Sequence, residues 1–331
     1  MNGKSSNPIG WVLGLAMVGE LHLELPYDFT INSLVANGGK YIYGLVDSAS
    51  SPYLMKWSSE GKLLHREPAP TCCGNISTGG DLVIISEIFS AELYICDTAL
   101  KFIKKLALET GCAPHLNSIP YKHVYPLGDG NLLVFGKYGA RGYLSMASVW
   151  DTSGKFLRDI ILPEAPWDLP MPFGSSPLSC MSNGELLLAA DAFSFKFYLV
   201  SLRGGGEVLK VFSPEIKGLE SLPPPSEKEG KEVYAFEKWL QRECISGHPC
   251  VATKPSYPLS DTVGVLFTSQ CADFTDLNMN PQIHIYDSKR GKVLWSGLAE
   301  GAILGGIKGD TLLIGKKGVA QWGKFYKAVV K

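Results

Sequence analysis

The stretch Trp150-Asp151-Thr152-Ser153-Gly154-Lys155-Phe156-Leu157 decides the fold, because the chain repeats its pattern several times. In each copy an apolar segment ends at Asp or Ser, a short polar turn follows, usually with glycine, and a second apolar segment departs. This order is typical of two antiparallel strands joined by a tight turn, a β-hairpin. The other copies lie at residues 57–64, 96–103, 200–209 and 286–294.

The hairpins recur at intervals of roughly forty to fifty residues, which is typical of a β-propeller with one four-stranded blade per repeat. Each repeat also contains a short apolar run that fits a strand buried on both faces between neighbouring blades. These runs lie at residues 41–46, 82–86, 132–136, 186–190, 263–268 and 311–315.

The last repeat ends one strand short of a complete unit. Residues 20–25 alternate between apolar and polar side chains before the first unit, and we expect them to supply the missing outer strand. The sequence therefore predicts an all-β fold, a six-bladed β-propeller closed by an N-terminal strand. Because blades that close a ring share one core, we expect a single domain over residues 1–331.

Composition supports a packed interior, because 45% of the residues are hydrophobic and only 19% are charged. The formal net charge of -1 gives no electrostatic reason to expect nucleic acid as a partner. No apolar run is long enough to span a bilayer, so we predict no transmembrane segment. The nearest run, residues 9–18, has the size of a signal-peptide core, and we interpret it as a strand or a buried arm. No clear signal peptide is present, and an export signal removed from upstream stays open.

Residues 213–258 interrupt the repeats between the fourth and fifth predicted blades. Three consecutive prolines at 223–225 indicate a stiff turn. Residues 227–243 then predict a helix, because Trp239 and its apolar neighbours share the spacing of one helix face. We expect this helical insertion to pack on one end of the propeller as a lid or docking surface, or to cover apolar surface as a simple loop.

The predicted second strands end in polar residues at corresponding places, one per blade: Asp47, Glu87, Lys137, Asp191, Gln270 and Lys316. In propellers these ends face the inter-blade loops and the mouth of the central channel, where ligands usually bind. Three carboxylates around a channel could bind a hard cation, and the two lysines could balance them or hold an anionic substrate. Strand ends are also polar because they meet water, so both interpretations stay open.

Repeat length, the number of repeats and the Asp/Ser-x-x-Gly-Lys hairpin resemble the six-bladed propeller group, which has NHL-repeat, TolB-like and lactonase or gluconolactonase-like members. The resemblance covers most of the chain outside residues 213–258 and implies the fold. Calcium-dependent lactonase-type members use a Glu, Asn residues and an Asp, for which Glu87, Asn131 and Asp191 are loosely placed here. Many members of the group are not enzymes and bind proteins or peptides on the same face.

Eight cysteines are many for a domain of this length. Cys96 falls in a predicted strand. The others fall in or near loops or the insertion, and we expect them to gather at one end: Cys72, Cys73, Cys112, Cys180, Cys244, Cys250 and Cys271.

Two disulfide pairings suit these positions: Cys244 with Cys250, and Cys112 with either Cys72 or Cys73. They would stabilise long loops and indicate an oxidising compartment, so we expect an exported protein, periplasmic or extracellular. Buried thiols are a second interpretation. Metal binding is a third, by Cys244, His248 and Cys250 or by Cys112 with His115, although neither spacing is that of a paired Cys-x2-Cys zinc site.

No nucleophile motif appears in the sequence. Trp167 and Phe173 belong to an apolar inter-blade loop that could form the wall of a peptide or ligand pocket, or be covered by the insertion with its Trp239. We therefore expect a non-catalytic binding or scaffold protein that holds a protein or peptide partner with its loop face, without a cofactor. The alternative is a divalent-metal-dependent lactonase or esterase-type hydrolase at the central channel, using Ca2+ or another divalent cation.

Overall fold

The computed structural model describes the strands and part of the segments that join them. The described residues are 15–25, 29–37, 40–48, 51–71, 74–87, 90–109, 123–135, 147–161, 177–180, 185–189, 197–212, 226–231, 235, 238–239, 242, 250–258, 263–271, 279–287, 292–298, 302–308, 311–317 and 322–330.

The described strands form six antiparallel sheets of four strands each, and in five of them four consecutive strands pair in chain order. The first sheet contains β2 (Phe29–Asn37), β3 (Tyr41–Ser48), β4 (Pro52–Ser58) and β5 (Leu63–Pro68). The second contains β6 (Gly74–Gly79), β7 (Leu82–Glu87), β8 (Glu92–Asp97) and β9 (Phe102–Ala107). The third contains β10 (His123–Pro126), β11 (Leu132–Phe135), β12 (Ala147–Trp150) and β13 (Phe156–Ile161).

The fourth sheet contains β14 (Pro177–Cys180), β15 (Glu185–Ala189), β16 (Phe197–Ser201) and β17 (Val208–Phe212). The fifth contains β18 (Cys250–Pro258), β19 (Val263–Cys271), β20 (Met279–Asp287) and β21 (Lys292–Leu298). The predicted insertion therefore extended too far, because residues 250–258 form the first strand of the fifth sheet and pair with β19. The segment between β17 and β18 is residues 213–249, and it contains the helix α1 (Glu227–Lys231).

The sixth sheet joins the two ends of the described chain. Its strands are β22 (Ala302–Lys308), β23 (Thr311–Lys317), β24 (Trp322–Val330) and the N-terminal β1 (Leu15–Leu21), in the order β1-β24-β23-β22. An N-terminal outer strand was predicted at residues 20–25, and Glu20 and Leu21 do pair with β24. Most of β1, however, consists of the residues that precede Glu20. The pairing with β24 starts at Leu15, which lies opposite Val330.

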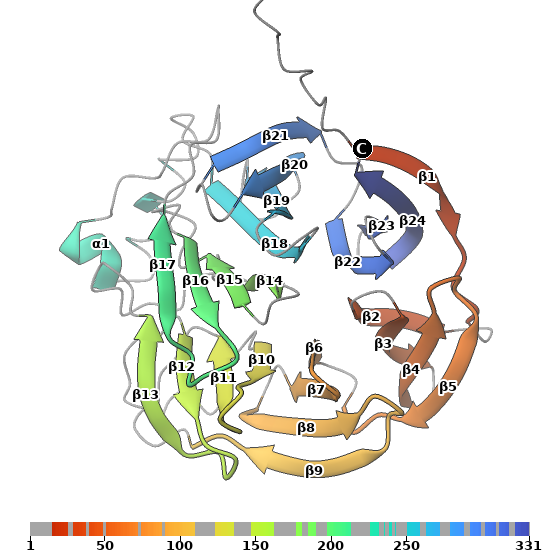
Figure 1. The fold of residues 1–331 in the computed structure, drawn as a ribbon, viewed down its shortest axis with the longest axis horizontal. Helices are drawn as coiled ribbons and strands as arrows, with labels where there is room; N and C mark the ends of the chain where they lie inside the picture. Colours follow the sequence, from red (N-terminus) through yellow and green to blue (C-terminus); the bar gives the residue numbers. More distant parts are fainter. Residues whose placement is uncertain are drawn as a thin grey trace, which may run out of the picture.

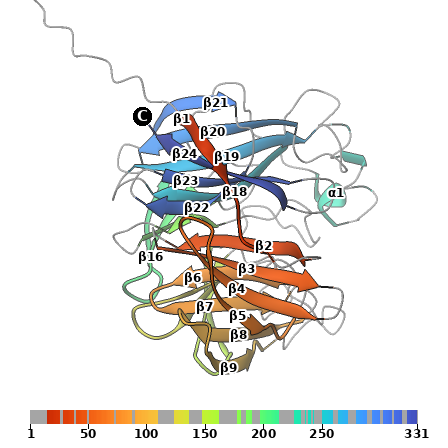
Figure 2. The ribbon, with the colours of Figure 1, turned by 90° about the vertical axis from the view of Figure 1, so that its right-hand side faces the viewer.

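Figure 1 shows the sheets arranged around a central axis, with one end strand of each sheet nearest the centre and the other at the rim. The inner strands of neighbouring sheets contact each other in the order β14, β18, β22, β2, β6 and β10. The third and fourth sheets share a core in which Val200 packs with Leu133 and Val149. Figure 2 shows the molecule from the side, with β1 and β24 lying together at its edge. This arrangement is that of a β-propeller.

In the first three sheets, where the structure describes the side chains of the second strands, these apolar strands are covered on both faces, as the sequence predicts. Ile42, Leu45 and Val46 of β3 have no exposed surface, and successive residues of a strand lie on opposite faces. Leu45 packs in one cluster with Ile85 of the second sheet. Ile42 and Val46 pack in another cluster with Leu313 of the sixth sheet. One strand therefore contributes to the cores on both sides of its own sheet.

The repeated hairpin turn does two things, and the turn after β12 shows both. The Asp151 carboxylate accepts hydrogen bonds from the backbone N–H groups of Ser153 (2.8 Å) and Lys155 (2.9 Å), which closes the turn. A hydrogen bond from the Ser153 hydroxyl, followed by these backbone bonds, holds the pKa of Asp151 below its usual value. The Gly154 carbonyl accepts from the Glu109 N–H at 2.8 Å, so the turn also docks on the segment that follows β9 of the preceding sheet.

The same docking recurs in the first sheet. Gly61 has a positive φ of 91°, and its carbonyl accepts from the Glu24 N–H at 2.9 Å, just after β1. In the second sheet Leu100 takes a positive φ of 67° in the corresponding turn. Repetition of the turn in the sequence thus reflects repetition of a contact between consecutive sheets.

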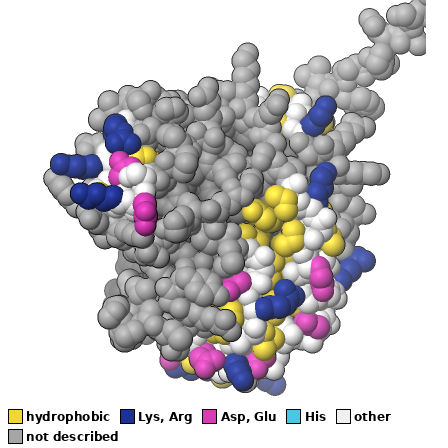
Figure 3. All heavy atoms as spheres, turned by 90° about the vertical axis from the view of Figure 1, so that its left-hand side faces the viewer, with side chains coloured by type: hydrophobic (Ala, Val, Ile, Leu, Met, Phe, Trp, Pro, Cys, Tyr) yellow, Lys and Arg dark blue, Asp and Glu magenta, His cyan; other side chains and the backbone are white. Residues whose placement is uncertain are grey.

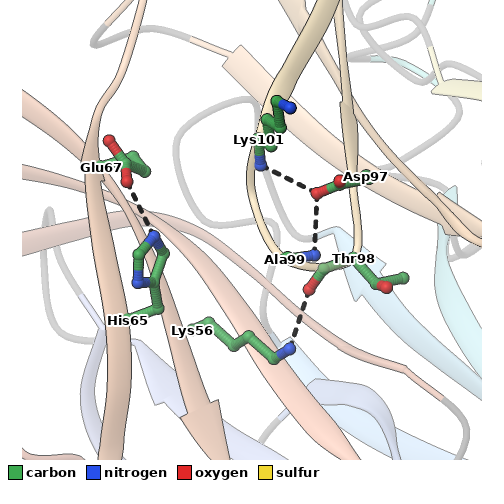
Figure 4. A network of polar contacts seen from close by, with 7 residues as sticks. All are labelled: Lys56, His65, Glu67, Asp97, Thr98, Ala99 and Lys101. Atoms are coloured by element: carbon green, nitrogen blue, oxygen red, sulfur yellow. Dashed lines mark hydrogen bonds and ion pairs between the residues drawn. The ribbon is translucent and has the colours of Figure 1, made fainter.

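A polar network joins the first and second sheets at this end (Figure 4). Asp97 accepts from the N–H groups of Ala99 (2.9 Å) and Lys101 (2.8 Å), which turns the Thr98 carbonyl toward the neighbouring sheet. That carbonyl accepts from the ammonium group of Lys56 at 2.8 Å. The exposed pair of His65 with Glu67 lies nearby on β5. That pair lies within one strand and is exposed, so it contributes little stability, whereas the Lys56 hydrogen bond connects the two sheets.

Serine side chains join the inner strands of the first three sheets. The Ser33 hydroxyl of β2 accepts from the Ile76 N–H of β6, and the Ser77 hydroxyl of β6 accepts from the Val124 N–H of β10, both at 3.3 Å. In each case the backbone N–H belongs to the inner strand of the neighbouring sheet, and the serine hydroxyl gives it an acceptor. An unpaired buried N–H costs free energy, so these hydroxyls stabilise the inner ring.

Replacing Ser77 with alanine is expected to lower the free energy of unfolding by about 1–3 kcal/mol, because the buried Val124 N–H loses its acceptor. Equilibrium unfolding in urea measures this change. Ser59→Ala, which removes an exposed hydroxyl bonded only to its neighbour Glu60, is the matched control and should change stability by less than about 0.5 kcal/mol. Equal losses in the two variants would contradict the role assigned to Ser77.

Candidate binding surface

Four of the six predicted channel-mouth residues lie at the described ends of second strands. Asp47, Gln270 and Lys316 are next to last in β3, β19 and β23, and Glu87 is last in β7. In each sheet the second strand ends on the side where the first strand begins, so the four positions are equivalent within their own sheets. Lys137 and Asp191 lie outside the described residues. The four placed residues come from four different sheets.

Glu87 is the best defined of these residues. Its carboxylate accepts hydrogen bonds from the hydroxyls of Ser90, at 2.5 Å, and of Thr71, at 3.4 Å. Thr71 is buried and lies shortly before β6, while Ser90 precedes β8. Glu87 therefore connects the chain that enters the second sheet with the segment that follows its second strand. Its carboxylate can hold these two segments together at this end of the sheet.

The structure separates two of the residues that the lactonase resemblance put forward together. Asn131 lies in the turn before β11, where its amide donates to the Asp129 carboxylate at 3.0 Å. It precedes a second strand, whereas Glu87 ends one, so the two residues lie at opposite ends of their sheets. A six-residue strand such as β7 is about 20 Å long. A shared calcium ion needs ligands within a few ångströms, and these positions do not favour one site for Glu87 and Asn131. Calcium binding by this chain stays a prediction. Asp191, the third residue, lies outside the described residues.

No group of three or more His, Cys, Asp or Glu side chains that could hold a metal ion occurs among the described residues. The metal interpretation of Cys244, His248 and Cys250 stays a prediction, because Cys244 and His248 lie outside the described residues. The same holds for Cys112 with His115. The two loop aromatics, Trp167 and Phe173, also lie outside them.

The helix of the insertion begins with a capping box that the sequence analysis missed. The Ser226 hydroxyl accepts from the Glu229 N–H at 3.3 Å, and the Glu229 carboxylate accepts from the Ser226 N–H at 2.8 Å. The signal was present as Ser-x-x-Glu ahead of the helix. Hydrogen bonds from Ser226, and then the nearby Arg242, hold the pKa of Glu229 below its usual value. The cap fixes where α1 starts.

Trp239 is a buried residue of this insertion. Its side chain is 1% exposed, although Lys238 and Arg242 beside it are exposed. Residues 235, 238, 239 and 242 are helical and lie within the range 227–243 where a helix was predicted. Trp239 was a loop-face candidate and also belongs to the apolar face of the predicted helix, and its side chain is buried. The described exposed residues of the helical segment include Glu227, Lys228, Lys238 and Arg242, and Figure 3 shows Lys, Arg and Glu side chains gathered on that part of the surface.

Exposed large hydrophobic side chains lie along the outer strands, and this feature was not foreseen from the sequence. They are Leu64 of β5, Phe102 and Ile103 of β9, Leu157 of β13, Val208, Leu209 and Val211 of β17, and Leu294 of β21. Figure 3 shows a band of hydrophobic side chains on the side of the molecule that carries β13 and β17. Leu209 and Val211 are 51% and 49% exposed on an end strand of the fourth sheet. A sequence signal exists, since β17 lacks the regular alternation of apolar and polar residues.

His123 begins β10, one of the inner strands, and lies opposite Phe135. Burial lowers the pKa of its imidazole to about 4. The folded protein therefore keeps this ring neutral at pH values where an unfolded chain would protonate it.

This difference predicts that the protein loses stability as the pH falls from about 6.5 to about 4. In this window the unfolded chain binds a proton at His123 and the folded chain does not, so unfolding becomes more favourable. Below about 4 both states are protonated and the contribution stops changing. The full loss is on the order of 3 kcal/mol. Unfolding free energies at several pH values, compared with a His123→Gln variant, measure it; a parallel pH dependence in both proteins would contradict the assignment.

The structure places Cys96, Cys180, Cys250 and Cys271 in strands. Cys96 of β8 is buried with a free thiol, and burial, followed by the charge of Asp97, raises its pKa to about 11. It is an inert core residue, as its predicted strand position indicated. Cys250 begins β18 and Cys271 ends β19, and the two lie opposite each other in the backbone register. The predicted disulfides stay predictions, because Cys72, Cys73, Cys112 and Cys244 lie outside the described residues.

Comparison with known proteins identifies the fold. No protein-family profile matches the chain, and no curated protein matches its sequence. A member of the DUF4221 family from Bacteroides vulgatus superposes with a TM-score of 0.66 at 10% identity, covering 96% of this chain and 98% of that one. A protein from Bacteroides fragilis, provisionally described as exported, superposes with a TM-score of 0.61 at 11% identity, covering 97% and 96%. The chain is a β-propeller.

These similarities extend over nearly the whole length of both proteins, so they concern the complete arrangement of sheets. They confirm the propeller resemblance predicted from the hairpin repeats. At 10% and 11% identity they show the fold alone, and site residues do not transfer between the chains. Among the described helical residues, none belongs to a helix long and apolar enough to cross a membrane.

Proposed function

We propose that residues 1–331 form one six-bladed propeller domain that acts as a non-catalytic binding or scaffold protein for a protein or peptide partner. The six sheets with touching inner strands support the blade number, since each sheet has the four strands of one blade. The N-terminal β1 closes the last blade by pairing with β24. The segment between the fourth and fifth blades contains the helix α1 and the buried Trp239.

The observation that carries the binding role is the exposed edge of β17. This strand ends its sheet, presents Val208, Leu209 and Val211 to solvent, and leads directly into the insertion. Outer strands such as β9 and β13 have two charged residues beside their exposed apolar ones, whereas β17 has only Lys210. Exposed apolar edges are places where another chain can pair as an additional strand. The partner we infer is therefore an extended protein segment with apolar side chains.

The test is quantitative affinity capture from an extract of the source cells, with the full chain as bait. We expect the double variant Leu209→Glu with Val211→Lys to lose its specific partners at least about tenfold, because charges oppose both strand pairing and apolar contact. The matched control, Leu64→Glu on β5, should capture the same partners as the unchanged protein. Circular dichroism should show that both variants are folded.

Two results would overturn the proposal. The first is identical capture by all three proteins, which would mean that the β17 edge is not used. The second is Ca2+-dependent hydrolysis of lactones or esters by the purified protein, which would favour the alternative hydrolase. An exported location fits the binding proposal, and one similar structure belongs to a protein provisionally described as exported.

A further inference from the structure

We propose that Cys250 and Cys271 form a disulfide across the first two strands of the fifth sheet. The backbone register pairs Cys250, the first residue of β18, with Cys271, the last residue of β19. The pairing continues without a shift to Lys254 opposite Phe267, so the register of the two cysteines is fixed by the ladder that follows them. This inference rests on the strand register and is independent of the proposed binding role.

The geometry of antiparallel strands suits such a bond. Residues directly opposite each other lie on the same face of the sheet, with Cα atoms about 4.5 or 5.5 Å apart. Disulfides join Cα atoms that are about 4.4–6.8 Å apart, so the bond forms without moving the strands. The other described cysteines lack such a partner in the register: Cys180 pairs with Leu186, and Cys96 pairs with Val83 and Phe102.

The reaction requires a disulfide oxidant, such as glutathione disulfide or a thiol–disulfide oxidoreductase. The thiolate of one cysteine attacks the oxidant, forms a mixed disulfide and releases one thiol. The second cysteine, as a thiolate, then attacks the sulfur of the first cysteine, and a second thiol leaves. Two protein thiols are oxidised, two electrons reduce the oxidant to two thiols, and the protons lost by the cysteines are taken up by the leaving thiolates.

The position gives the bond a structural consequence. The chain enters β18 at Cys250 directly from the insertion, and β19 ends at Cys271, away from the turn that joins the two strands. A covalent link at this open end stops the strands from separating where the insertion meets the propeller. Because such bonds persist in oxidising compartments, the link also indicates export.

The test treats the purified full chain with glutathione disulfide, blocks remaining thiols with iodoacetamide and maps cross-linked peptides by mass spectrometry without reduction. Trypsin leaves both cysteines on one peptide, because Lys254 precedes Pro255 and the next basic residue is Lys289. Chymotrypsin cleaves after Phe267 and separates the two cysteines. We expect a cross-linked peptide pair that contains Cys250 and Cys271 and disappears on reduction.

Three serine variants distinguish the possible pairings. The cross-link should persist in Cys244→Ser and be lost in Cys250→Ser and in Cys271→Ser. Loss of the cross-link in Cys244→Ser would overturn the proposal, because Cys244 would then be the partner. Alkylation of both Cys250 and Cys271 after oxidation would overturn it as well. The cross-link is read in the unchanged protein, so the result does not depend on whether every variant folds.

Discussion

Replacing Gly154 with alanine is expected to lower the free energy of unfolding by about 2–4 kcal/mol. Gly154 has a positive φ of 89°, a backbone conformation that costs a residue with a side chain about 1–2 kcal/mol. An added Cβ would also lie 2.1 Å from the backbone carbonyl oxygen of Ala107, closer than any real contact. The turn would have to leave the preceding sheet and break the hydrogen bond from the Glu109 N–H to the Gly154 carbonyl.

Gly130 provides a matched control for this substitution. Its φ is 88°, nearly that of Gly154, but an added Cβ would meet nothing within 4 Å. Gly130→Ala should therefore cost only the conformational part, about 1–2 kcal/mol. Denaturant unfolding of the two variants gives the cost of the contact with Ala107 as their difference. Indistinguishable losses would show that the turn of the third sheet does not depend on close approach to the second.

Replacing Trp57 with alanine is expected to cost about 3–5 kcal/mol, the largest effect foreseen for this chain. Trp57 of β4 is fully buried in a cluster that also contains Leu21 of β1 and Leu313 of β23. The cavity would open between the first and sixth sheets, where the N-terminal strand closes the ring. Its indole N–H also donates to the Glu24 carbonyl at 2.8 Å, so the substitution removes a hydrogen bond to the segment after β1.

A second measurement locates this effect. Hydrogen exchange of the β1 amides should become faster in Trp57→Ala, because the segment that follows β1 loses its anchor. Trp150→Ala is the matched control, since Trp150 is equally buried but its indole bonds to Ser148 of its own strand. It should destabilise the protein by a similar amount without a selective change in β1. Unchanged exchange in β1 for Trp57→Ala would contradict a role of this residue in closure.

Much of the fold could be predicted because the turns are encoded locally. Asp151 and Gly154 specify a turn through their own hydrogen bonds and backbone conformation, and the same residue types recur in several repeats. Apolar runs such as that of β3 indicate strands covered on both faces. A strand of this kind needs a neighbouring sheet on each face. Together with the repeated hairpins, this requirement predicts a propeller. Local rules of this type operate over a few residues and are visible in a single sequence.

The candidate site was harder to predict, because its residues come from different repeats. Glu87 and Asn131 both suit calcium binding by residue type, yet one ends a second strand and the other precedes one. Residue type does not reveal which end of a sheet a position occupies. Exposure of Leu209 was not foreseen for a related reason, because it depends on what another segment covers.

The sequence by itself determined the all-β class, the turns, the repeats and the N-terminal location of the closing strand, since all of these follow from local hydrogen bonding and from the period of apolar residues. The tertiary structure decided the rest. It set the register that brings Cys250 opposite Cys271, the first strand of the fifth sheet, and the docking of the Gly61 and Gly154 turns on the preceding sheets. These features depend on pairs of segments far apart in the chain, and only packing selects one such pairing among the many that local propensity permits.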